Sequence, residues 1–153
     1  MQIEISKEQY KDLIMMSAVA NSVFGMLGDS ENAGNYKKQS LRMDGIEAHL
    51  LGSAEDFGCG DLMQDDEGAV ILNDEFYENV VMPILEEYEE MQAFDLLTNK
   101  LAWRDFKKEH TKHEINKMAE QNGGYFGVEV YEYEKRYWDE FEKNGFERLE
   151  IKR

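Results

Sequence analysis

The sequence predicts a mainly α protein of the α+β class, a helical bundle of about five helices with a small β-sheet near the termini. Apolar residues recur at three- and four-residue steps over most of the chain, which is the pattern of helices that bury one face. The first and last residues instead alternate polar and apolar, as half-buried strands do. Proline occurs only once, at Pro83, so little of the chain is denied to helices.

The N-terminal third is expected to hold one short strand and two helices. Residues 2–5 alternate, and Ser6 followed by Gln9 has the spacing of a capping box, which starts a helix that ends near Gly28. A second helix is expected over about residues 36–57. Two glycines inside it weaken this helix, since each costs about 1 kcal/mol relative to alanine.

The rest of the chain is expected to be helical up to a terminal strand. Residues 69–72 are apolar but too few for a helix, so they are expected to be extended. A helix capped by Asn73 or Asp74 follows, and Pro83 should kink or interrupt it. The remaining elements are helices over about residues 93–109 and 111–121, an aromatic-rich helix ending at Asn144 and Gly145, and an alternating strand over residues 146–151. The two alternating ends are expected to pair as the sheet.

The chain of 153 residues is expected to be a single domain over residues 1–153. A chain of this length buries roughly 70% of the surface of its unfolded form, so its core needs no disulfide or metal. Cys59 is the only cysteine, and the first residues lack a basic region followed by an apolar run. These features predict a cytoplasmic protein.

The negative charge is concentrated in one segment. The net charge is −16, and residues 43–99 contain sixteen acids and no lysine or arginine. Such a segment repels nucleic acid and anionic membranes and attracts basic surfaces, so the expected partner is a protein with a basic surface. The plainer interpretation is an acidic face that keeps the protein in solution. The candidate partner-binding residues are Asp65, Asp66, Glu67, Glu86, Glu87, Glu89 and Glu90.

One short constellation has the composition of a metal site. His110 and His113 are three residues apart, so on a helix they would share a face, and Glu114 could join them as a third ligand. The spacing is not that of the zinc-protease motif, and several lysines nearby oppose cation binding. A divalent metal at these three residues is therefore the only cofactor that the sequence suggests.

No motif assigns a catalytic residue. The chain has no nucleophile elbow, phosphate-binding loop or dinucleotide fingerprint. Asp56 and Asp61 flank Cys59 and disfavour a reactive thiolate. The basic stretch over residues 100–117 has a net charge of about +3 and could contact phosphate, but it is expected to pair with the acidic segment, within the fold or across a homodimer.

Several short segments resemble a group of small acidic bacterial proteins of unknown function. The segments are Ile3-Glu4-Ile5-Ser6, Leu101-Ala102-Trp103-Arg104-Asp105, Tyr137 through Phe141-Glu142 to Asn144-Gly145, and Leu149-Glu150-Ile151. They cover about a third of the chain. The resemblance implies a bacterial cytoplasmic protein, but no activity and no site residues.

These observations favour a non-enzymatic interaction or regulatory module. Its most concrete form is an inhibitor or nucleic-acid mimic whose carboxylates occupy a basic groove on another protein. The alternative is a metal-dependent hydrolase that uses His110 and His113. A homodimer that scaffolds a larger complex is the third hypothesis.

Overall fold

The structure, a computed structural model, describes residues 4–29 and 34–150. The chain divides into two compact units, residues 1–87 and 88–153. The elements are α1 (Lys7–Asp29), α2 (Tyr36–Leu51), η1 (Gly60–Leu62), β1 (Met63–Asp66), β2 (Ala69–Leu72), α3 (Asp74–Phe76), η2 (Tyr77–Val81), α4 (Met82–Glu109), α5 (Lys112–Gln121) and α6 (Gly127–Asn144). Helix α4 begins in the first unit and continues into the second. That the whole chain is a single domain stays a prediction.

The predicted fold class is confirmed. The described residues contain five helices of ten or more residues and one small antiparallel sheet, β1–β2. This sheet lies in the middle of the chain, with Met63 opposite Leu72 and Asp66 opposite Ala69. Near the chain ends, residues 4–5 and 146–150 form no strand, and the rest of the expected terminal strands lies outside the described residues.

The position of the sheet has a simple physical reason. Pairing the two ends of the chain would close a loop of about 140 residues, and the entropic cost of closure grows with loop length. A hairpin closes the same kind of ladder with a loop of two residues, Glu67 and Gly68. Both have positive φ, 52° and 88°, which is the conformation that a tight hairpin turn with the twist of its strands requires.

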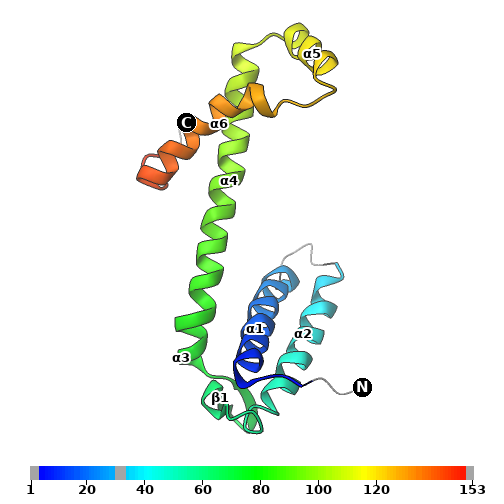
Figure 1. The fold of residues 1–153 in the computed structure, drawn as a ribbon, viewed down its shortest axis with the longest axis vertical. Helices are drawn as coiled ribbons and strands as arrows, with labels where there is room; N and C mark the ends of the chain where they lie inside the picture. The colour runs from blue at the N-terminus through cyan, green and yellow to red at the C-terminus, as the bar shows by residue number, and fades with distance from the viewer. Residues whose placement is uncertain (1–3, 30–33, 151–153) are drawn as a thin grey trace. The chain divides into compact units, whose positions relative to one another are not determined.

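In the first unit, α1 and α2 run side by side in opposite directions and pack against the hairpin region (Figure 1). Tyr10 and Ile14 of α1 are buried in this unit. The other buried residues of this core are Ala18, Leu51, Ala54, Cys59, Leu62, Leu72, Val81 and Leu85.

Helix α2 ends at Leu51, six residues before the predicted end. Gly52 is its C-cap, and residues 52–58 form turns. The end of α2 and these turns pack on α1: the Tyr10 hydroxyl donates to the Leu50 carbonyl of α2, and the Tyr10 ring stacks on Phe57 of the turns with ring centroids 4.1 Å apart. The apolar spacing of Phe57 thus reflects a loop that folds back on the core.

The backbone is helical without a break from Asp74 to Glu109, and a π-helical turn, η2, ends just before Met82 and Pro83. A proline inside a helix removes one backbone hydrogen bond. The π-helical turn, in which the Met82 N–H bonds to the Tyr77 carbonyl, accommodates this change in pairing. Beyond it α4 continues through Ala93 to Glu109, so the two helices expected over residues 74–109 are largely one.

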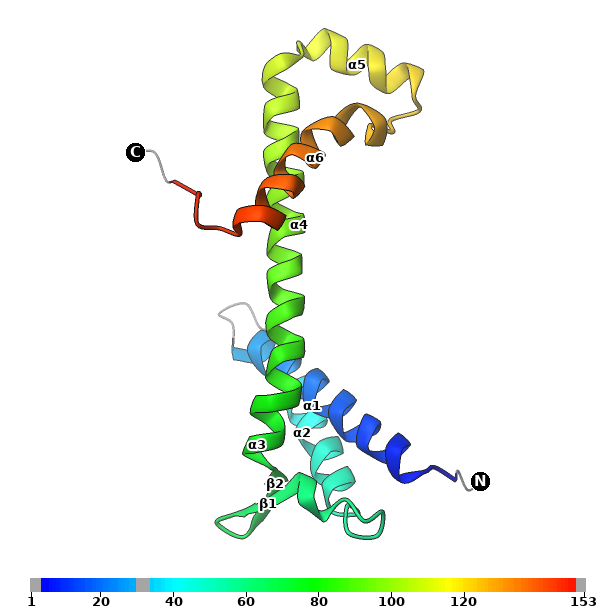
Figure 2. The ribbon, with the colours of Figure 1, turned by 60° about the vertical axis from the view of Figure 1, so that its left-hand side comes forward.

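In the second unit, α6 packs across α4 (Figure 2). Ala102 and Phe106 of α4 are buried against Val130 and Tyr133 of α6. Helix α6 ends at Asn144, with Gly145 as its C-cap, as predicted. Among the described residues, no helix combines the length and apolar character that crossing a membrane requires.

Candidate functional site

Three of the predicted partner-binding acids lie at the tip of the hairpin. Asp65 and Asp66 end β1, and Glu67 is the first residue of the turn. All three are exposed, and Asp65 Oδ1 accepts a hydrogen bond of 3.2 Å from the backbone N–H of Gly68. The hairpin therefore presents three adjacent carboxylates to solvent.

The other four predicted acids lie on α4. Glu86 and Glu87 belong to the first unit, and Glu89 and Glu90 belong to the second. All four are exposed. Residues at positions i, i+1, i+3 and i+4 cover one half of a helix, so these carboxylates repel one another. Like the hairpin tip, this surface has no nearby cation on its own helix, since α4 has no basic residue before Lys100.

The acidic segment is almost free of ion pairs. Of its sixteen acids, all of them described, only Asp61 forms one, with Lys11 Nζ at 3.6 Å. Within the second unit, Arg104 and Lys108 bind Asp105, which lies outside the acidic segment. Fifteen of the sixteen carboxylates therefore have no cation partner within their own unit among the described residues, and pairing between the basic stretch and the acidic segment stays a prediction.

The expected helical face of His110, His113 and Glu114 is not formed. Helix α4 ends at Glu109, His110 lies in the connection, and His113 is on α5. The reason is a capping box: the Glu114 carboxylate accepts hydrogen bonds from the backbone N–H of Thr111 at 2.7 Å and from its hydroxyl at 2.8 Å, and this starts a new helix.

The two histidines also have different surroundings. The His110 ring lies 4.6 Å from the Phe106 ring, whereas His113 is exposed. The capping contacts hold the pKa of Glu114 below its usual value, chiefly through the Thr111 backbone. Over residues 4–29 and 34–150, no three histidine, cysteine or acidic side chains are grouped so that they could hold a metal ion.

The first unit contains a polar cavity that the sequence did not predict. Its volume is about 220 Å³. It is lined by Ala18, Asn21 and Ser22 of α1, Glu47 of α2, Ile71 and Leu72 of β2, Asp74 of α3 and Tyr77 of η2. Five of these eight side chains carry a polar group, and these five come from four elements, α1, α2, α3 and η2.

Glu47 contributes a half-buried carboxyl group to this cavity. Its side chain is half-buried, and burial raises the pKa of its carboxyl group. A hydrogen bond with the Asn21 side chain opposes this shift, and the charge of Asp44 adds to it. A carboxylate with a raised pKa in a polar cavity is typical of functional sites, although buried structural groups have raised values too.

A signal for Glu47 was present in the sequence. Met43, Glu47 and Leu51 are four residues apart on α2, and the first and last of them are half-buried and buried. An acid between two inward-facing apolar residues is expected to face inward as well. The rest of the cavity depends on the packing of the hairpin and η2 against α1, and no local sequence pattern predicts this packing.

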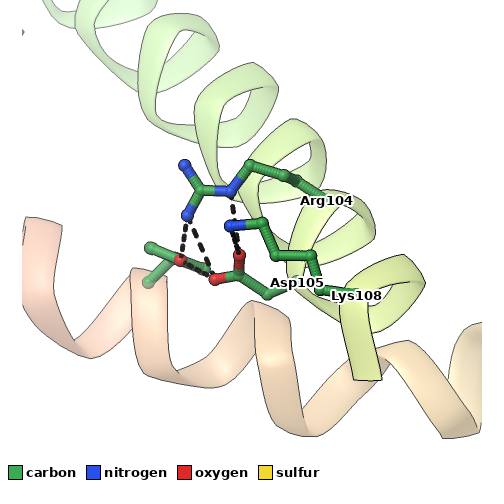
Figure 3. A network of polar contacts seen from close by, with 4 residues as sticks. Arg104, Asp105 and Lys108 are labelled. Carbon is green, nitrogen blue, oxygen red and sulfur yellow. Dashed lines mark hydrogen bonds and ion pairs between the residues drawn. The ribbon is translucent and has the colours of Figure 1, made fainter. Parts of the chain in front are cut away.

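A second polar cluster joins α4 to α6 (Figure 3). Arg104 Nε lies 2.8 Å from Asp105 Oδ1, and Lys108 Nζ lies 3.2 Å from the same oxygen. The Tyr137 hydroxyl accepts from Arg104 at 3.0 Å and donates to the other oxygen of Asp105. Arg104, followed by Tyr137, holds the pKa of Asp105 well below its usual range. Both oxygens of Asp105 accept hydrogen bonds, so the cluster ties α4 to α6 in the second unit.

The comparisons with known proteins place the chain in no class. No family model matches it, no curated protein matches it, and no solved structure matches it. The function therefore has to be argued from the residues alone.

Proposed function

We propose that the protein is a non-enzymatic interaction module that binds a protein partner through its acidic surface. In its most specific form it is an inhibitor that occupies a basic groove, where its carboxylates replace the phosphates of a nucleic acid. The observation that carries the proposal is the set of fifteen acids in residues 43–99 that have no cation partner within their own unit among the described residues.

The unpaired acids lower the stability of the folded chain. Clustered like charges destabilise the compact state through mutual repulsion. At Glu86, Glu87, Glu89 and Glu90 the repulsion acts within about one turn of α4. A partner with lysine and arginine side chains at this spacing would relieve that repulsion and release bound ions. Binding should therefore be fast and should weaken with salt.

The hairpin acids support the same proposal by their position. Asp65, Asp66 and Glu67 are adjacent and exposed at the end of a hairpin whose backbone is held by the pairing of β1 with β2. A rigid carrier reduces the entropy that charged side chains lose on binding.

The test is affinity capture from the native cell with the wild-type chain and a neutralised variant, Asp65→Asn with Asp66→Asn and Glu67→Gln. A matched control, Glu120→Gln with Glu132→Gln and Glu142→Gln, removes the same charge at exposed acids outside the segment. We expect a basic protein that binds the wild type and the control, binds the variant at least about tenfold more weakly, and is displaced by DNA. Equal capture by all three chains would contradict the proposal.

A further inference from the structure

The cavity beside Glu47 has an unusual balance of hydrogen-bonding groups. Ser22 Oγ lies 2.9 Å from the Ala18 carbonyl oxygen and 3.0 Å from the Tyr77 hydroxyl. A carbonyl oxygen only accepts, so the single proton of Ser22 is donated to Ala18. The Tyr77 hydroxyl must then donate its own proton to Ser22, and its oxygen keeps accepting capacity.

Two of the remaining polar side chains of the cavity, Glu47 and Asp74, are acceptors too. The Glu47 carboxylate accepts from the Asn21 amide and has further lone pairs, and the Asp74 carboxylate has no ion pair among the described residues. Three acceptor sites therefore border the cavity, two of them negatively charged. Asn21 supplies the one lining side chain that has a free N–H donor.

A ligand that suits this cavity has donors only and a positive charge. An ammonium group has three donors and no acceptor, and a guanidinium group has five donors and no acceptor. The volume of about 220 Å³ is below that of ordinary small-molecule sites and is suited to the end of one side chain. The apolar side chains of Ala18, Ile71 and Leu72 would contact the methylene groups that precede the charge.

We propose that the Glu47 cavity receives one lysine or arginine side chain of the basic partner, with Glu47, Asp74 and Tyr77 as its acceptors. This inference rests on the proposed function and adds the position at which a single side chain is recognised. The exposed acids attract the partner over a distance, whereas the cavity selects one cationic side chain at contact. Hydrogen bonds to a half-buried carboxylate are stronger than those to the exposed acids, because solvent screens them less.

The experiment uses the full chain, ¹⁵N-labelled, and two small probes, N-acetyl-arginine methylamide and N-acetyl-lysine methylamide. The citrulline analogue is the neutral control of nearly the same shape. We expect one of the cationic probes to shift the side-chain amide signals of Asn21 in a saturable titration, while the citrulline analogue has no effect. No shift at Asn21 with either cationic probe would overturn the inference.

Two variants test the assignment of the cavity. Glu47→Gln should weaken binding of the cationic probe by about tenfold or more, the loss expected for one charge-assisted hydrogen bond. Glu55→Gln removes the same charge from an exposed residue of the first unit that does not line the cavity, and its affinity should stay within about twofold. Equal weakening by both variants would show general attraction by net charge and would overturn the assignment.

Failure of this inference is distinguishable from failure of the proposed function. If partner capture depends on the hairpin acids but the probes leave Asn21 unchanged, the acidic surface binds without the cavity. If the probes bind the cavity but Glu47→Gln leaves partner capture unchanged, the cavity does not receive a partner side chain. Either result would reject the inference and leave the proposed function in place.

Discussion

The Tyr137 hydroxyl donates a hydrogen bond to the Asp105 carboxylate and so joins α6 to α4 in the second unit. The same carboxylate accepts from Arg104 and Lys108, both on its own helix. Burial, and then the bond to Asp105, raises the pKa of Tyr137, so this hydroxyl remains a donor at neutral pH. One ionised carboxylate thus organises three donors at the junction of two helices.

The first prediction is that Asp105 makes the second unit sensitive to acid. The pKa of Asp105 is lower in the folded chain than the value of about 3.9 in an unfolded one. Its stabilising contribution is therefore present above about pH 4 and is lost as the pH falls toward the folded pKa. We expect Asp105→Asn to lower the free energy of unfolding by about 1 kcal/mol at pH 7, and this difference should shrink below pH 4.

Tryptophan fluorescence is a suitable measurement, because Trp103 and Trp138 are the only tryptophans and both lie in the second unit. Urea titrations between pH 7 and pH 3 give the free energy at each pH. Asp139→Asn, at an exposed residue of α6 that forms no ion pair in the described structure, should change it little. If the difference in the free energy of unfolding between wild type and Asp105→Asn does not change with pH, the acid sensitivity does not come from Asp105.

The second prediction is that ionisation of Glu47 destabilises the first unit, whereas ionisation of Asp105 stabilises the second. Burial raises its folded pKa, so its contribution to stability is complete below the unfolded value of about 4.3 and is lost as the pH rises through the folded pKa. Asp44 adds to the shift, the Asn21 side chain opposes it, and no cationic residue lines the cavity. The ionised carboxylate therefore destabilises the first unit, and Glu47→Gln should be more stable than the wild type at a pH above the folded pKa.

Hydrogen exchange of the buried Ile14 and Leu51 amides measures this in the first unit. The gain from Glu47→Gln should grow as the pH rises through the folded pKa and vanish below about pH 4. Glu55→Gln is the control, because it removes an exposed acid of the same unit. A loss of protection in Glu47→Gln at pH 7 would mean that the carboxylate stabilises the fold instead. A gain in stability together with weaker probe binding is the pattern of a group kept for function.

The helices could be predicted from the sequence because their signals are local. The apolar period locates α1, and the Ser6–Gln9 capping box occurs as expected, with the Ser6 N–H bonded to Gln9 at 2.9 Å. The sheet could not be predicted in the same way. Residues 63–66 read Met-Gln-Asp-Asp, which has no alternation, and their pairing depends on a turn that begins with glutamate, a residue that rarely takes positive φ.

The candidate sites likewise divide into features that local sequence predicts and features that depend on tertiary packing. The exposure of the predicted acids follows from their chemistry. His110 and His113 would share a face only on one continuous helix, and the cue against such a helix is local, since Thr111 followed by Glu114 is itself a capping-box sequence. The cavity around Glu47 has no local cue apart from the spacing on α2, because its walls come from segments up to about sixty residues apart.

The third prediction concerns the start of α5. Thr111→Ala removes the hydroxyl that accepts from the Glu114 backbone N–H, so α5 should lose about 1 kcal/mol of helix stability. Glu114→Gln keeps an oxygen that can accept from the Thr111 N–H and should leave the helix intact. Backbone chemical shifts over α5 (Lys112–Gln121) measure its helix content. Fraying of α5 in Glu114→Gln would show that the charge, rather than the reciprocal bonds, starts the helix.

The fourth prediction concerns the hairpin turn and the balance between stability and binding. Glu67 has a φ of 52°, a conformation that costs an ordinary residue about 1 kcal/mol but that asparagine tolerates. Glu67→Asn should therefore slow hydrogen exchange in the paired residues of β1 and β2. Glu67→Gln removes the same charge without a residue suited to positive φ, so it should not have this effect. If both variants slow exchange equally, relief of repulsion between Glu67 and its acidic neighbours is the cause, and the backbone explanation is wrong.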